Sequence, residues 1–137
     1  MTESIPILVL VSFGLFFLYT GVISFQRPGP FAKSLSLEAV GVSGEVEIRA
    51  QYGGFFFAAA LSQFAPLIGL LSEVSALIVS STIFGGLFFG RLAAALAGPK
   101  IHTLSSTLRA LFVIDAVGFI AASGAIALIV LQPEPTI

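Results

Sequence analysis

The segment "GEVEIRAQYGGFFFAAAL", residues 44–61, places charged side chains directly against a long apolar run. Two glutamates, Glu45 and Glu47, and one arginine, Arg49, precede Tyr52 and a run of phenylalanine and alanine. A charged side chain inside hydrocarbon is costly unless it is paired or reaches the membrane surface. The segment therefore predicts a helix that enters a membrane at its charged end, with an internal polar site close to that entry.

The composition of the whole chain agrees with a membrane environment. Of the 137 residues, 57% are hydrophobic and 9% are charged, and the mean hydropathy is +1.08. Soluble domains carry about a quarter charged residues, so this composition predicts an all-α integral membrane protein. The length fits one small helical domain, 1–137. The formal net charge of −1 gives no indication of nucleic-acid binding, and the absence of cysteine excludes disulfides and thiolate metal sites.

Four apolar runs approach the ~20 residues that a helix needs to cross about 30 Å of hydrocarbon. We expect a four-helix transmembrane bundle with spans at about 5–24, 46–71, 73–97 and 105–131. Pro66 should kink the second span, and the connections fall at about 25–45 and 98–104. Glu3 and the absence of a basic residue before the first run favour a retained span over a cleaved signal peptide.

The distribution of basic residues predicts the orientation of the bundle. All six lie in or beside the connections after the first and third runs: Arg27, Lys33, Arg49, Arg91, Lys100 and Arg109. By the positive-inside rule these connections are cytoplasmic, so both termini are expected on the non-cytoplasmic side of a bacterial inner (cytoplasmic) membrane. The centre of the first connection, "AKSLSLEAV", is compatible with a short interfacial helix or with an ordered polar loop.

Small residues recur at four-residue spacing in the second, third and fourth runs. Such spacing predicts helix faces where another backbone can approach closely. The predicted packing positions are Gly54, Ala58, Gly86, Gly90, Ala94, Gly118 and Ala122. The glycine pairs Gly53–Gly54 and Gly85–Gly86 are not phosphate-binding loops, because they lie inside spans and no surrounding P-loop pattern is present.

Asp115 is the deepest charge in the predicted bundle. It lies six residues beyond Arg109, about 9 Å further into the membrane at ~1.5 Å per residue. An aspartate near mid-membrane costs ~2.5–3.5 kcal/mol on insertion scales, so a partner is expected. Arg49 and Arg91 approach from the cytoplasmic side, and Tyr52 should reach a similar depth. We predict an intramembrane polar cluster in which Asp115 pairs with Arg49 or Arg91 and the Tyr52 hydroxyl caps the pair.

The two glutamates of the opening segment have different expected positions. Glu45 lies four residues before Arg49, a spacing that lets the two side chains pair, whereas Glu47 faces another side of the helix. Three roles for the cluster are open: a structural pair, a binding or gating site for a small solute, lipid headgroup or proton, and a catalytic site. Because no nucleophile has an adjacent base, no catalytic residue is assigned.

His102 is the only histidine and falls in the second cytoplasmic connection. A single histidine without neighbouring ligands does not make a metal site, so we predict an ordinary loop residue rather than an axial ligand to haem or chlorophyll. No cofactor is predicted, and a bound lipid or pigment is left open.

The stretch "EVEIRAQYGGFFFAAAL", followed by "GRLAAALAGP" and an acid in the last run, resembles the small four-span bacterial membrane proteins grouped as domain-of-unknown-function family 4345. The matching positions are Glu47, Arg49, Tyr52, Gly53, Gly54, Arg91 and Asp115. The family more often has glutamate at the last of these positions. The resemblance implies that the polar cluster belongs to the design of the family, and it implies no activity.

These patterns predict an accessory or scaffolding subunit that packs against a larger membrane complex and is not an enzyme. The small-residue faces favour contact with other integral membrane subunits, and little of the chain lies outside the bilayer. A small-solute or proton carrier that uses the Asp/Arg/Tyr cluster is the alternative, and a lipid headgroup-modifying enzyme is a weaker third hypothesis. The expected partners are the lipid bilayer and other membrane proteins, with no nucleic acid.

Overall fold

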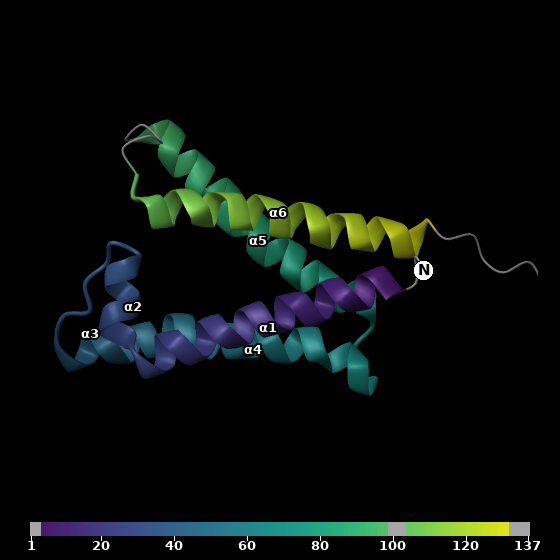
Figure 1. Cartoon of the computed structure of the whole chain (residues 1–137), viewed down its shortest axis with the longest axis horizontal. Helices are drawn as coiled ribbons and strands as arrows, with labels where there is room; N and C mark the ends of the chain where they lie inside the picture. Colours follow the sequence, from purple (N-terminus) through teal and green to yellow (C-terminus); the bar gives the residue numbers. More distant parts are fainter. Residues whose placement is uncertain (1–3, 99–103, 132–137) are drawn as a thin grey trace, which may run out of the picture.

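The computed structural model describes residues 4–98 and 104–131, and within these ranges the fold is all-helical, which confirms the predicted fold class at this level (Figure 1). The elements in chain order are α1 (Ser4–Gln26), α2 (Pro28–Ser34), α3 (Gly41–Ile48), the π-helix η1 (Arg49–Gly54), α4 (Phe55–Phe64), the 3₁₀-helix η2 (Ala65–Ile68), α5 (Glu73–Ala97) and α6 (Ser106–Val130). Three of them, α1, α5 and α6, are long and apolar enough to cross a membrane.

The ends of the long helices follow local sequence signals. Helix α1 ends where Arg27 takes φ −131° and ψ 62°, because the following Pro28 disfavours helical geometry at the residue before it. Ser72 caps α5 by accepting a hydrogen bond from the Ser75 N–H at 3.1 Å. Ser105 caps α6 in the same way, accepting from the Leu108 N–H at 3.3 Å. These caps place the start of each helix within one or two residues of the sequence expectation.

The second predicted span is helical from residue 41 to residue 68, but its geometry changes along its length. In η1 the N–H of Phe55 bonds to the carbonyl of Ala50, five residues back, which makes a wide π-helical turn. Pro66 lies in the 3₁₀ turn of η2 at the far end. The helix stops at Gly69, whose φ of 71° is left-handed, and not near residue 71 as the apolar run suggested.

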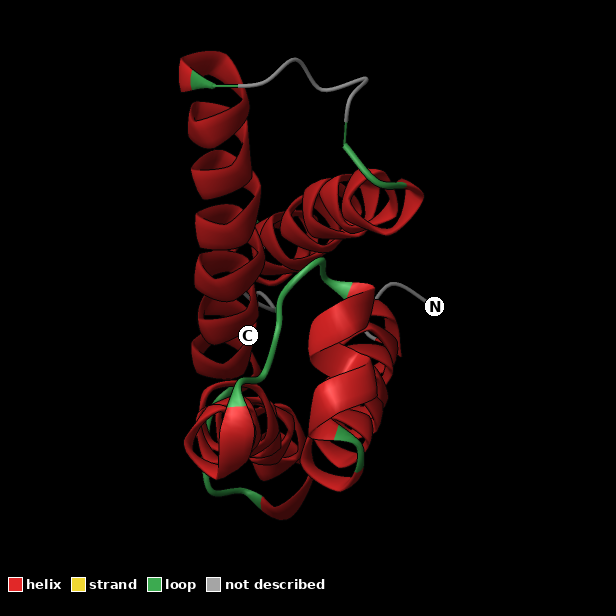
Figure 2. Ribbon diagram, turned by 90° about the vertical axis from the view of Figure 1, so that its left-hand side faces the viewer, coloured by secondary structure: helices red, strands yellow, loops and turns green. Residues whose placement is uncertain are grey.

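The helices pass back and forth between two ends of the molecule (Figure 1). Helix α1 packs along η1 and α4, and α5 packs along α6. Helices α2 and α3 lie at the same end as the last turn of α5 and the first turn of α6, and the start of α1 lies at the other end with the α4–α5 connection. Helix α5 is inclined to the other long helices, which are seen closer to end-on in Figure 2.

An aromatic cluster forms the centre of the core. The Phe17 ring of α1 and the Phe84 ring of α5 are stacked with centroids 5.3 Å apart and an interplanar angle of 22°, and both side chains are buried. Phe13 and Phe56 add to the same cluster. A second, aliphatic cluster lies nearer the start of α1: Leu10, Ala76, Leu77 and Ala125.

Of the seven predicted helix-packing positions, Gly118 and Ala122 are buried. A Cβ atom on Gly118 would lie 2.6 Å from Phe84, so this glycine makes room for a ring rather than for another backbone. Gly85 of α5 likewise makes room for a ring of α6, because a Cβ on Gly85 would lie 2.9 Å from Phe119.

The other five predicted helix-packing positions do not lie in the core of this chain. All five face outward and are exposed: Gly54, Ala58, Gly86, Gly90 and Ala94. A Cβ added at Gly86 or Gly90 would meet nothing within 4 Å. Four-residue spacing marks a helix face but does not say whether that face turns inward, and here the neighbouring face with Gly85 is the one that packs.

Gly118→Ala should lower stability because the added methyl group overlaps a fully buried ring in a close-packed core. We expect a loss of about 1–3 kcal/mol, seen as a lower midpoint of thermal unfolding in detergent. Gly124→Ala is the control on the same helix, because a Cβ there meets nothing within 4 Å. Equal midpoints for the two variants would show that the Gly118 contact with Phe84 does not constrain packing.

Candidate functional site

Arg91 and Asp115 form an ion pair between α5 and α6, through Nη1 of the arginine and Oδ2 of the aspartate. Asp115 is 3% exposed, and the Arg91 side chain is about a quarter exposed. The two helices pack along each other, so a residue near the end of α5 meets one more than two turns into α6. Of the two arginines predicted as partners for the aspartate, the structure pairs Arg91.

Arg49 has a different set of contacts. Its Nη1 lies 3.2 Å from Oε2 of Glu45, the predicted partner one turn earlier, and its Nε donates to the carbonyl of Phe25 at 3.1 Å. That carbonyl belongs to the last turn of α1, where backbone acceptors lack partners within the helix. Arg49 therefore ties η1 to the end of α1 and does not reach Asp115. Glu47 is exposed and lies outside the cluster.

A cavity of about 200 Å³, here called the central cavity, lies between the helices next to the ion pair. Phe17, Phe84 and Asp115 form its buried end, whereas Ser34 and Thr107 at its other end are exposed. Its polar lining residues come from every long helix: Thr20, Ser34, Tyr52, Arg91, Thr107 and Asp115. Five phenylalanines complete most of the wall: Phe16, Phe17, Phe31, Phe56 and Phe84.

Tyr52 is brought to the central cavity by the π-helical turn of η1. Its ring packs edge-on against Phe31 of α2, with centroids 5.2 Å apart. Gly53 lets η1 approach the end of α1 closely, because a Cβ there would lie 3.0 Å from Phe25. In the part of the chain that the structure describes, the Tyr52 hydroxyl makes no hydrogen bond, so the predicted cap on the ion pair is not formed. Single π-helical turns occur frequently at functional sites.

The central cavity presents both hydrogen-bond donors and acceptors. The hydroxyls of Thr20 and Ser34 already donate to backbone carbonyls of their own helices, at 2.9 Å and 2.7 Å. The Tyr52 hydroxyl and the guanidinium of Arg91 can still donate to a ligand. Because Asp115 neutralises Arg91, a further charge in this cavity would be buried without a partner, at a cost of several kcal/mol. The site suits an uncharged molecule with acceptor oxygens.

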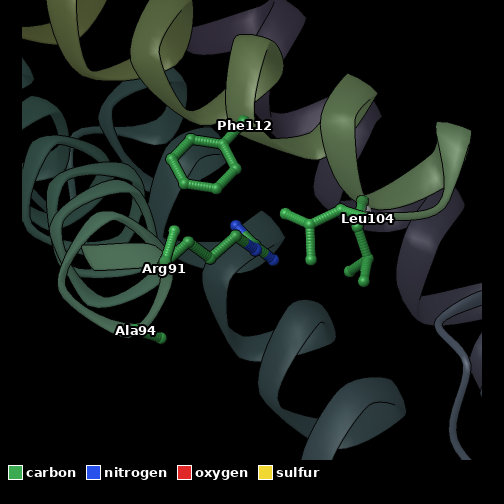
Figure 3. Close-up of a pocket in the computed structure, with 6 residues that line it drawn as sticks. Arg91, Ala94, Leu104 and Phe112 are labelled. Carbon is green, nitrogen blue, oxygen red and sulfur yellow. The ribbon is translucent and has the colours of Figure 1, made fainter. Parts of the chain in front are cut away.

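Arg91 also borders a second cavity, of about 210 Å³, between the end of α5 and the start of α6. Figure 3 shows its guanidinium extending between Phe112 and Leu104. The remaining lining residues are apolar: Ala94, Ala95 and Leu108. Arg91 therefore lines both this apolar cavity and the central cavity, whose lining is partly polar.

The sequence did not indicate the hydroxyls of Thr20, Ser34 and Thr107 as site residues. Isolated serine and threonine residues occur throughout the apolar runs, and nothing in their spacing distinguishes those that face a cavity. The prediction for His102 lies outside the described residues.

Comparisons of the chain with protein-family models, with curated proteins and with solved structures find no match. The resemblance to family 4345 stays a prediction. Function is therefore argued from the geometry of the site alone.

The ion pair can be tested with a double-mutant cycle. Arg91→Met and Asp115→Leu should each destabilise the protein by about 3–5 kcal/mol, because each leaves one buried charge without its partner. The double variant should unfold at a higher temperature than either single variant, since it leaves no buried charge. Additive losses in thermal unfolding would contradict coupling between the two side chains.

Proposed function

We propose that this chain is a four-span protein of a bacterial inner membrane and that it binds a small uncharged molecule in the central cavity. Three of the spans are α1, α5 and α6. The remaining span, second in chain order, is the helical segment from residue 41 to residue 68, which lies beside α1. Its interrupted geometry does not prevent it from crossing, because π and 3₁₀ turns still satisfy backbone groups within the helix.

The arrangement of basic residues supports an orientation with both termini outside. Arg27, Arg49, Arg91 and Arg109 all belong to segments near the end of the molecule that contains α2 and α3 (Figure 1). That end faces the cytoplasm by the positive-inside rule. The exposed mouth of the central cavity, at Ser34 and Thr107, then opens near the cytoplasmic surface.

This topology is testable with single cysteines, because the chain has none of its own. Glu38→Cys, in the exposed α2–α3 connection, should be protected from a membrane-impermeant thiol reagent in intact cells. Leu70→Cys, in the exposed α4–α5 connection, should be labelled. The reverse pattern would overturn the orientation, and equal labelling of both would overturn the four-span topology.

One observation carries the proposed binding function: the buried ion pair lines a cavity instead of closing it. A purely structural pair would gain most from complete packing around it, because packed interiors leave few voids larger than a water molecule. Here the pair shares a space of about 200 Å³ with Tyr52, whose hydroxyl has no partner among the described residues. Ionisable groups inside membrane proteins commonly mark binding sites.

The buried end of the central cavity supports binding from one side over transport. The stacked rings of Phe17 and Phe84, both buried, separate it from the other half of the bundle. A solute or proton carrier would need these rings to part during each cycle. The binding function needs no such movement.

The outward small-residue face favours a second candidate function, that of an accessory subunit in a larger membrane complex. Gly86, Gly90 and Ala94 lie on one side of α5, and the structure leaves this side uncovered. Small residues on membrane helices allow close approach of another helix.

Purification in a mild detergent, with mass spectrometry of bound small molecules and proteins, tests both functions. The two tyrosines of the chain supply the variants, because Tyr52 lines the cavity and Tyr19 is exposed on the outer face of α1. We expect an uncharged small molecule to co-purify with wild type and with Tyr19→Phe. Tyr52→Phe should retain about fivefold less, the effect of one lost hydrogen bond of about 1 kcal/mol.

Equal retention by the two variants would remove Tyr52 from the site. Recovery of stoichiometric membrane subunits without a small molecule would favour the accessory function over binding. Elution alone, with neither kind of partner, would overturn both.

A further inference from the structure

A groove of about 540 Å³ lies on the outer surface, between η1 and α4 on one side and α5 on the other. Gln51, Phe55 and Gly86, which line it, are exposed. Gly86 gives the groove depth, because a Cβ atom at this position would meet nothing within 4 Å. In the proposed topology this surface faces the hydrocarbon of the bilayer.

The groove and the central cavity share three wall residues, which are Tyr52, Phe56 and Leu87. These side chains border both the outer groove and the space beside the Arg91–Asp115 pair. Leu87 is partly exposed, and Tyr52 belongs to the wide π-helical turn. Exposed side chains change rotamer on a picosecond to nanosecond scale, so this wall is a short path between bilayer and cavity.

The central cavity alone is small for an organic ligand. Its volume of about 200 Å³ falls below the range of about 300–1,000 Å³ that is typical of ligand pockets. A ligand small enough to fit entirely in this cavity would gain little affinity from it. The adjoining groove more than doubles the space and supplies an apolar surface, because Phe55, Ile83 and Leu87 line it.

We propose that the groove holds the hydrocarbon tail of the ligand whose head occupies the central cavity. The ligand is an uncharged amphiphile with a small planar head that carries acceptor oxygens, and it enters sideways from the bilayer. This inference rests on the proposed binding function and specifies the ligand class for it.

Each property of the ligand follows from the lining. The head is uncharged because Asp115 already neutralises Arg91. It carries acceptor oxygens because the Tyr52 hydroxyl and the Arg91 guanidinium are donors. It is planar because five phenylalanine rings line the cavity, and aromatic rings pack favourably with flat partners in offset or edge-on geometry. The tail follows from the apolar groove beyond Tyr52 and Phe56.

The test compares the gain in affinity that a tail provides in matched variants. The probes are a dimethoxy-methyl-benzoquinone with a decyl chain and the same ring without the chain. Binding is measured in phosphatidylcholine nanodiscs, with empty nanodiscs used to subtract partition into lipid. Gly86→Leu fills the groove, and Gly90→Leu is the control one turn further along α5, where a Cβ also meets open space and no groove residue is changed.

We expect the decyl chain to increase binding at least tenfold in wild type and in Gly90→Leu. The gain should fall below twofold in Gly86→Leu, while all three proteins bind the ring without the chain equally. Equal thermal unfolding midpoints for the two leucine variants would show that both fold. An equal tail gain in both variants would overturn the groove as the tail site.

Other outcomes separate this inference from the proposed function. Failure of wild type to bind either quinone probe, with a small molecule still co-purifying through Tyr52, would overturn the planar amphiphile and leave the binding function standing. If wild type binds the ring tightly and the decyl chain does not increase binding, lateral entry through the groove is overturned. Loss of both quinone binding and co-purification would overturn the two proposals together.

Discussion

The pairing of Arg91 with Asp115 is the constraint on which the rest of the structure depends. A carboxylate at this depth is costly unless a cation reaches it, and the only way for an arginine on α5 to do so is for α5 and α6 to pack along each other in one register. In that register Phe84 meets Gly118 and Phe119 meets Gly85. Charge pairing and the fit between rings and glycines therefore specify the same arrangement.

The pair formed by α1 and α4 meets the pair formed by α5 and α6 through aromatic rings, and these rings also bound the central cavity. Phe13, Phe17, Phe56 and Phe84 hold α1 and α4 against α5 at the middle of the molecule. Toward the α2 end no comparable cluster fills the space between the pairs in the described residues, and the central cavity lies there. The rings thus act both as the joint between the pairs and as the end wall of the cavity.

The sequence predicted much of the fold because the signals involved are local. The apolar runs predicted the long helices to within a few residues. The choice of Arg91 over Arg49 was not predictable, because it depends on the carbonyl of Phe25 capturing Arg49. That contact joins residues far apart in the sequence.

The direction that the small-residue faces take was not predictable for a related reason. A stripe such as Gly86, Gly90 and Ala94 is visible in the sequence, but the direction it faces depends on which neighbour α5 selects. Gly85, one residue away, was overlooked because a single buried glycine opposite Phe119 leaves no periodic signal. The π-helical turn was not predictable either, since its wide hydrogen bonding depends on contacts with α1 and α2.

The π-helical turn also makes the number of residues in its segment a structural requirement. Loss of one residue between Arg49 and Gly54 would remove the wide turn and restore ordinary α-helical geometry, in which each N–H bonds to the carbonyl four residues back. The side chains within the segment would then take different directions relative to α1 and α2, so the position of Tyr52 at the central cavity depends on the number of residues in this turn. Sequences that share this fold are therefore expected to tolerate substitution in the segment more readily than a change in its length.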